Sequence, residues 1–170
     1  RLTVLLGIGE AVGADTYDWV LDRLRGEFSV RDGGHTRPVT AFSEPRRVSL
    51  PGHGRRRVYR YDLADQHVLA RTTDIPTVGT WLCYDSRLAT GLSALAARTG
   101  MVDRLLGVVD RERIVDTLVR AAERSPVGGD PFVVLATVAG ERDGSPTTVR
   151  RWVRGHDQGR ATAVVAATVA

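Results

Sequence analysis

The stretch EPRRVSLPGHGRRRVYRYDLADQHVLARTTDIPTVGTWLCYDSRLAT, residues 44–90, predicts strand, strand, short helix and strand in that order. Two strands over residues 47–50 and 56–61 flank PGHG, a segment whose proline and glycines suit a tight reversal. Asp62 can cap the helix that follows, and residues 77–84 form a mostly apolar strand. Consecutive strands before a helix indicate an antiparallel meander and not the regular strand–helix alternation of a parallel sheet.

The sequence that follows this stretch completes an α+β pattern. A three-helix region comes first, and within it Leu88, Leu92 and Leu95 recur at helical spacing and form one apolar stripe. Residues 132–139 and 147–154 flank an Asp-Gly turn and predict a hairpin. We therefore expect an α+β fold with a mixed, largely antiparallel sheet, helices packed on one face and self-association through the other.

The composition narrows the class of protein. All 24 basic residues are arginine, the net charge is +4, and acidic residues occur throughout the chain, so no cationic face is concentrated enough to predict a nucleic-acid partner. At 170 residues the chain suits one domain, residues 1–170, with its own core. Its most apolar stretch, residues 161–170, is too short to span a bilayer, and no signal peptide opens the chain. We expect a cytoplasmic protein with no membrane partner.

Cysteine and histidine give no sign of a catalytic or metal site. Cys83 is the only cysteine, so no disulfide forms within the chain, and its place in a predicted buried strand indicates an inert core thiol. The four histidines, His35, His53, His67 and His156, show no metal-ligand spacing. The sequence therefore predicts no metal site, and we assign no catalytic residue.

A glycine-rich segment competes with the meander interpretation. GIGEAVG, residues 7–13, follows an apolar run and precedes a helix, and an acidic residue ends the next predicted strand. This alternative makes the chain a compact dinucleotide-binding domain. Against it, the helix is expected to begin beyond the third glycine, and strands follow where further strand–helix units are needed. We favour glycines that turn the chain between strand and helix. The residues of the alternative cofactor site are Gly7, Gly9, Gly13 and Asp32.

The arginine-rich strand RRRVYRY, residues 55–61, is the strongest candidate binding site. Alternation places two arginines and two tyrosines on one face. Guanidinium groups bind carboxylates in bidentate geometry and tyrosine adds a hydroxyl, so this face suits an anionic small molecule or a subunit interface. A solvent-exposed strand face in an arginine-rich chain is the alternative. The candidate substrate-binding residues are His53, Arg55, Arg57, Tyr59 and Tyr61.

Three segments carry a resemblance to a known family. They are FSEPRRVSLPGHGRRRVYRYDLADQHVLA at residues 42–70, VGTWLCYDSR at 78–87 and GHDQGRATAVVAATVA at 155–170. Through them the chain resembles the C-terminal part of saccharopine dehydrogenase-like oxidoreductases, which pair an N-terminal Rossmann domain with an α+β substrate-binding and dimerisation domain. The resemblance spans nearly the whole chain and matches no hydride-transfer residue.

That resemblance implies an NAD(P)-dependent oxidoreductase whose NAD or NADP is held mainly by a Rossmann domain outside these residues. The chain would then be truncated at both ends and inactive alone, would bind an anionic small-molecule substrate, and would form a homodimer. A non-catalytic binding or interaction module is a further alternative.

Overall fold

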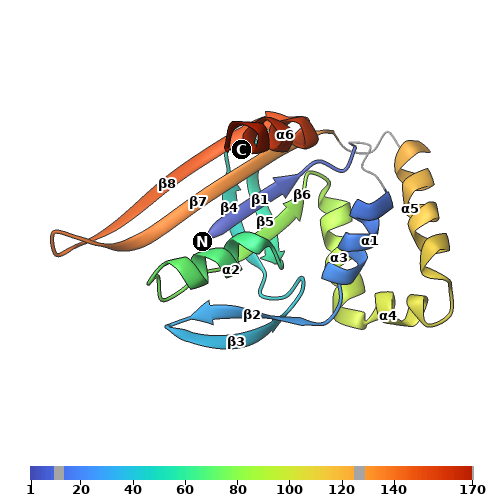
Figure 1. The fold of residues 1–170 in the computed structure, drawn as a ribbon, viewed down its shortest axis with the longest axis horizontal. Coiled ribbons are helices and arrows are strands. Elements are labelled where there is room, and N and C mark those ends of the chain that lie inside the picture. Colours follow the sequence, from blue (N-terminus) through green and yellow to red (C-terminus); the bar gives the residue numbers. More distant parts are fainter. Residues whose placement is uncertain (10–13, 125–128, 170) are drawn as a thin grey trace.

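The structure is a computed structural model that describes residues 1–9, 14–124 and 129–169. Strands and helices alternate irregularly along the chain (Figure 1). In chain order the elements are β1 (Leu2–Leu6), α1 (Ala14–Arg23), β2 (Glu27–Asp32), β3 (His35–Thr40), β4 (Arg46–Leu50), β5 (Gly54–Arg60), α2 (Ala64–Thr72), β6 (Thr80–Tyr84), α3 (Arg87–Thr99), α4 (Met101–Leu106), α5 (Arg111–Arg124), β7 (Pro131–Arg142), β8 (Ser145–His156) and α6 (Gln158–Val169).

Six of the strands form one sheet in the order β4-β5-β6-β1-β7-β8, and β2 pairs with β3 in a separate hairpin. Within the described residues, β1 and β6 are the one parallel pair, and every other pairing is antiparallel. The sheet is therefore mixed and mostly antiparallel, and the α+β class expected from the sequence is confirmed.

The six-stranded sheet is curled, so that a side chain of one edge strand reaches the other edge strand. Arg150 on β8 donates from its Nη2 to the backbone oxygen of Ser49 on β4 at 3.1 Å, although these strands are at opposite ends of the strand order. The concave face encloses a core made only of strand residues: Leu5, Leu50, Val58, Trp81, Cys83, Val133 and Leu135. The centre of the face that we expected to associate with a partner is therefore buried within the chain.

Helices cover the convex face. Tyr59, Tyr61 and Leu82 point outward from the sheet and pack with Phe42 and with Ala94 of α3. A second apolar cluster joins α1 to α3, α4 and α5 behind this layer: Leu21, Ala96, Val102, Ile114 and Val115. The arrangement of helices on one face agrees with the sequence expectation. Among the described residues, no helix has both the length and the apolar character needed to cross a bilayer.

The PGHG segment forms the hairpin turn that its sequence predicts. It joins β4 to β5, and Leu50 pairs with Gly54 at the closed end. Gly52 and Gly54 have φ angles of 76° and 65°, in the left-handed region that other residues disfavour. Glycine at these two positions therefore permits the turn that fixes the register of β5 against β4, and with it the positions of the β5 arginines.

Two sequence expectations for the helices differ from the structure. Asp62 does not cap α2: Leu63 occupies the N-cap position without a side-chain hydrogen bond, because the Asp62 carboxylate binds other side chains. The leucine stripe of α3 faces solvent, with Leu88 70% exposed, while the helix buries Thr90 and Ala94. Small residues let α3 approach the sheet closely. The helix therefore packs on the sheet through the face of Thr90 and Ala94, and its more apolar leucine face is exposed.

Candidate functional site

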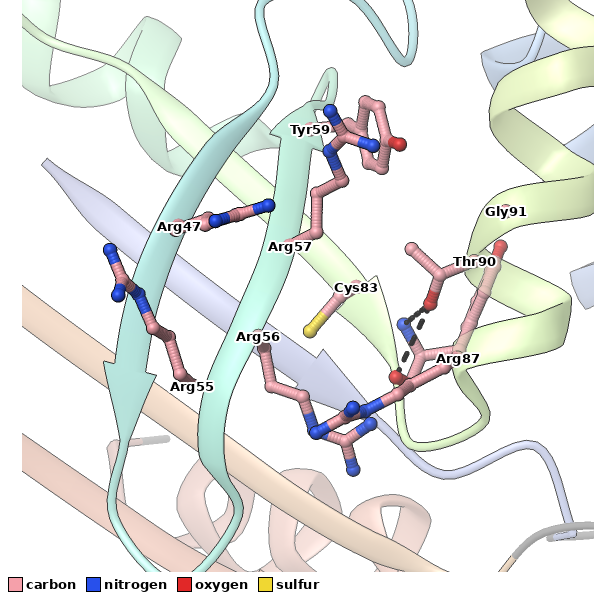
Figure 2. Close-up of a pocket in the computed structure, with 10 residues that line it drawn as sticks. Arg47, Arg55, Arg56, Arg57, Tyr59, Cys83, Arg87, Thr90 and Gly91 are labelled. Atoms are coloured by element: carbon pink, nitrogen blue, oxygen red, sulfur yellow. Dashed lines mark hydrogen bonds between the residues drawn. The ribbon is translucent and has the colours of Figure 1, made fainter.

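A pocket opens where β5 separates from β6. β5 pairs with β6 only at Tyr59 and Arg60, whereas β6 pairs with β1 at all five of its residues. Cys83 and Tyr84, at the end of β6, therefore have no neighbouring strand on the β5 side. The pocket has a volume of about 430 Å³ and lies between β5, the end of β6 and the start of α3 (Figure 2).

Arginine dominates the lining of this pocket. β4 supplies one arginine, β5 supplies three and α3 supplies its first residue. Among the described residues, no carboxylate lines the pocket and none of these five guanidinium groups forms an ion pair, whereas Arg23, Arg37 and Arg60 elsewhere bind carboxylates. The pocket therefore carries positive charge that the rest of the chain leaves unneutralised. The five arginines are Arg47, Arg55, Arg56, Arg57 and Arg87.

The arginine side chains differ in direction. Figure 2 shows Arg56 from β5 and Arg87 from α3 extending into the pocket from opposite walls, while Arg57 extends toward Tyr59. Arg56 is held by its Nε, which donates to the backbone oxygen of His53 at 3.2 Å. This bond leaves the two Nη groups of Arg56 free to form paired hydrogen bonds with an anion.

The first turn of α3 forms one wall of the pocket. Ser86 caps this helix, because its Oγ accepts a hydrogen bond from the backbone N–H of Ala89 at 3.2 Å. The hydroxyl of Thr90 accepts the N–H of Tyr84 at 3.0 Å and lies 3.4 Å from the backbone oxygen of Tyr84, and the two dashed lines in Figure 2 mark these contacts. The positive end of the helix and the Arg87 guanidinium therefore meet at the same wall, and both favour a bound anion.

The groups at the base of the pocket are neutral. Burial raises the pKa of the Cys83 thiol to about 12, against a smaller opposing effect of the Arg56 charge. Burial likewise raises the pKa of Tyr84 to about 12. A protonated thiol is a poor nucleophile, and the described residues lining the pocket include no histidine or carboxylate to act as a base. The arrangement is suited to binding an anion.

The structure brings together three of the five residues predicted to bind substrate. Arg55, Arg57 and Tyr59 line the pocket. His53 contributes its backbone oxygen to Arg56, and its ring Nδ1 lies 3.2 Å from the oxygen of Pro51.

Tyr61 does not reach the pocket. It is buried in the core, edge-on to the ring of Phe42 with centroids 5.6 Å apart. Strand alternation correctly put Tyr61 on the face of Tyr59, but β5 passes beneath the helical layer at that end. Sequence reasoning missed Arg47, Arg56 and Arg87, because they come from the neighbouring strand, the opposite strand face and a helix.

Asp32 of the alternative dinucleotide site lies on a strand that does not pair with β1, which leads into Gly7 and Gly9. β2 pairs with β3 and not with β1, so β1, α1 and β2 do not form the strand–helix–strand unit that such a site needs. Asp32 belongs to the hairpin, where it binds the Nε of Arg37 at 2.9 Å. Gly13 lies outside the described residues.

Packing explains the glycine at the end of β1. A Cβ on Gly7 would lie 2.4 Å from the backbone oxygen of Gly129, which also accepts the N–H of Gly9 at 2.9 Å. Gly7 is therefore required for close packing against the segment that leads into β7.

Other site types find no support in the described part of the chain. No group of three or more histidine, cysteine, aspartate or glutamate side chains there is placed to hold a metal ion. Comparison with known proteins gave no match, either to a family model or to a curated protein. The geometry of the pocket and the sequence resemblance are therefore the observations that bear on function.

Proposed function

We propose that this chain is the substrate-binding and dimerisation domain of an NAD(P)-dependent oxidoreductase of the saccharopine dehydrogenase-like type. In this proposal the pocket between β5, β6 and α3 holds the anionic group of a small-molecule substrate. The observation that carries the binding role is the set of five arginines, none of them paired with a carboxylate among the described residues. The oxidoreductase assignment rests on the sequence resemblance.

The charge of the pocket supports an anionic ligand. Two unit charges 4 Å apart interact by about 4 kcal/mol at the effective dielectric near a protein surface, so clustered guanidinium groups repel one another unless an anion lies between them. A carboxylate or phosphate relieves this repulsion and accepts paired hydrogen bonds from Arg56 and Arg87. A substrate with two anionic groups would engage more than one of the arginines.

The chemical step is assigned to a domain outside these residues. The pocket has neutral Cys83 and Tyr84 at its base and no general base in its lining. Asp32 belongs to a β2–β3 hairpin that does not pair with β1, the strand that precedes Gly7 and Gly9. NAD or NADP would therefore be held elsewhere, its nicotinamide would supply or accept the hydride, and the isolated chain would be inactive.

Self-association is assigned to the hairpin of β7 and β8. This hairpin projects beyond the body of the domain, and β8 is the last strand in the order (Figure 1). Val138, Val149 and Val153 lie on one face of it, each about half exposed. Apolar side chains exposed together on one face of a projecting hairpin suit packing against a second apolar surface. We assign that surface to the same hairpin face of another copy of this chain, in a homodimer.

The pocket itself also favours a second candidate function, a non-catalytic anion-binding module. Both functions predict anion binding, and they differ in whether a cofactor-loaded partner domain uses the anion. Titration of the isolated chain with NADH and NADPH is expected to show no binding. Saturable binding would instead support the dinucleotide alternative and would overturn the proposal that a separate domain holds the cofactor.

The binding role is tested by calorimetric titration with acetate, glutarate and phosphate at low and high salt. We expect saturable binding that weakens as salt rises. The double variant Arg56→Gln, Arg87→Gln should bind at least about tenfold more weakly, a loss of about 1.4 kcal/mol. The control variant Arg104→Gln, Arg120→Gln removes the same charge from exposed helix positions and should bind normally. Equal weakening in both variants would mean that only net charge matters and would overturn the assignment.

A further inference from the structure

A second groove lies between α1, α2 and the β2–β3 hairpin. Its volume is about 550 Å³, and it shares no lining residue with the arginine pocket. α2 contributes its exposed side, and the two strands of the hairpin form the opposite wall. Its lining includes the aromatic and charged side chains Trp19, Arg23, Arg31, Asp62, His67 and Arg71.

A buried carboxylate organises one end of this groove. The side chain of Asp62 is only 10% exposed, yet it lines the groove and accepts hydrogen bonds from Gln66, at 3.2 Å, and from the Nη1 of Arg23. It also contacts the Nε2 of His67. The ring of His67 is thereby fixed, and among the described residues its Nδ1 has no partner. The Asp62 carboxylate therefore holds a histidine whose second nitrogen can reach a ligand.

Two arginines bring unneutralised charge to the same groove. Arg31 donates from its Nη1 to the backbone oxygen of Thr73 at 2.9 Å, a bond that orients the guanidinium without cancelling its charge. Arg71, in the last turn of α2, has no ion pair among the described residues. Three arginines and one carboxylate, Asp62, line the groove, so it retains a net positive charge.

The groove also exposes apolar surface beside these charges. Trp19 is 41% exposed although it lines the groove, and Val68 on α2 is exposed as well. The indole is held in place by Tyr61, with ring centroids 6.0 Å apart, and by the Arg23 guanidinium 5.4 Å above the ring. A held, exposed aromatic ring next to cations suits a ligand that combines a flat apolar group with an anionic one.

We propose that this groove is a second small-molecule site, which binds an organic anion carrying an aromatic or similarly flat apolar group. Arg31 and Arg71 bind the anionic group, Trp19 and Val68 contact the apolar group, and the Nδ1 of His67 forms a hydrogen bond to the ligand. The site is independent of the proposed function of the arginine pocket. A carboxylate or a phosphate can serve as the anionic group, because both accept paired hydrogen bonds from guanidinium groups.

Phenyl phosphate is the probe that contains both parts of this chemistry. Its binding is followed through the indole N–H signal of Trp19 in a proton–nitrogen correlation spectrum of the whole chain. The chain has three tryptophans, and the variant Trp19→Phe assigns the signal by removing it. We expect a saturable shift of this signal and weaker binding of both inorganic phosphate and phenol. Benzoate in place of phenyl phosphate shows whether a carboxylate serves equally well.

Matched variants test whether the groove side chains bind phenyl phosphate. Arg71→Gln and His67→Gln should each weaken phenyl phosphate at least about fivefold, whereas Arg104→Gln, in the last turn of α4, should leave binding unchanged. The double variant Arg56→Gln, Arg87→Gln should retain the Trp19 shift, which separates failure here from failure of the arginine pocket. Absence of a Trp19 shift, equal effects of Arg71→Gln and Arg104→Gln, or equal binding of inorganic phosphate would overturn the proposal.

Discussion

The hydroxyl of Thr90 accepts the backbone N–H of Tyr84 at 3.0 Å, at the position where β5 has already left β6. Thr90 is buried and thus replaces the hydrogen bond that a neighbouring strand would supply. The substitution Thr90→Val keeps the shape of the side chain and leaves this buried N–H unpaired. We expect the free energy of unfolding to fall by about 1–3 kcal/mol, measured by urea denaturation.

A matched threonine controls for the loss of the hydroxyl. Thr99, at the end of the same helix, donates its hydroxyl to the backbone oxygen of Leu95 at 2.9 Å but is exposed. Thr99→Val should therefore change the stability by less than about 0.5 kcal/mol. If both variants lose the same stability, the Thr90 bond does not hold α3 against the end of β6.

Glu44 neutralises a buried arginine. The Arg60 side chain is 1% exposed and donates from its Nε to Glu44 at 2.9 Å, while Arg37 binds the other carboxylate oxygen at 2.7 Å. Burial opposes ionisation of Glu44, but the hydrogen bonds from Arg60 and Arg37 outweigh it, so the pKa of Glu44 lies below its usual value. Glu44→Gln should lower the free energy of unfolding by about 3–5 kcal/mol, since it leaves a buried charge without its partner.

The same carboxylate predicts a loss of stability in acid. Because the native pKa of Glu44 is lowered, its contribution is complete above the ordinary carboxyl pKa and is lost as the pH falls through the native value. The difference in stability between wild type and Glu44→Gln should therefore shrink on acidification. Glu141→Gln, on the exposed β7–β8 hairpin, is the control and should be neutral. A constant difference down to strongly acidic pH would contradict this role.

Gly7 tests the packing explanation of the glycine-rich segment. Gly7→Ala places a Cβ 2.4 Å from the oxygen of Gly129, and backbone must move to relieve the clash. We expect a loss of about 1–3 kcal/mol in a thermal or urea unfolding experiment. Gly140→Ala on β7, where a Cβ meets nothing within 4 Å, should cost little. Equal stability of the two variants would remove the packing requirement at Gly7.

Local signals in the sequence predicted the elements that depend on local chemistry. PGHG is a hairpin turn because two left-handed residues must be glycine, and the Asp-Gly signal at residues 143–144 marks the turn between β7 and β8. These positions are determined by backbone sterics alone. The α+β class followed from them, because hairpins between neighbouring segments make a largely antiparallel sheet.

The sequence could not predict features that arise from contacts between distant segments. Asp62 precedes a helix and has the chemistry of a cap, but Arg23 from α1 and His67 compete for its carboxylate. Arg87 lies beside the arginines of β5 because β5 and β6 diverge, and the periodicity of the sequence does not predict that divergence. The curl that joins Arg150 to Ser49 likewise depends on residues about a hundred positions apart.

The burial of Cys83 predicts how stability changes in alkali. Its pKa is raised by burial from an ordinary value of 9.0 to about 12, so at pH values well below 9 the thiol is protonated in both the native and the unfolded chain. Above that pH the unfolded chain ionises first, and stability falls by up to about 1.4 kcal/mol per pH unit until the native thiol also ionises. Cys83→Val should flatten this fall in urea midpoints measured between pH 8 and pH 10. An unchanged slope would mean that the thiol titrates normally in the folded protein.

The exposed valines of the β7–β8 hairpin test the dimer. Val149 pairs with Val138 across the hairpin, and a charge there would be buried against the second copy in the proposed assembly. Val149→Glu should convert a dimer to a monomer in sedimentation velocity, because an unpaired buried charge costs several kcal/mol. Val108→Glu, at an exposed valine between α4 and α5, is the control and should sediment as wild type. Wild type that sediments as a monomer at every concentration, or Val149→Glu that remains dimeric, would exclude this hairpin face as the interface.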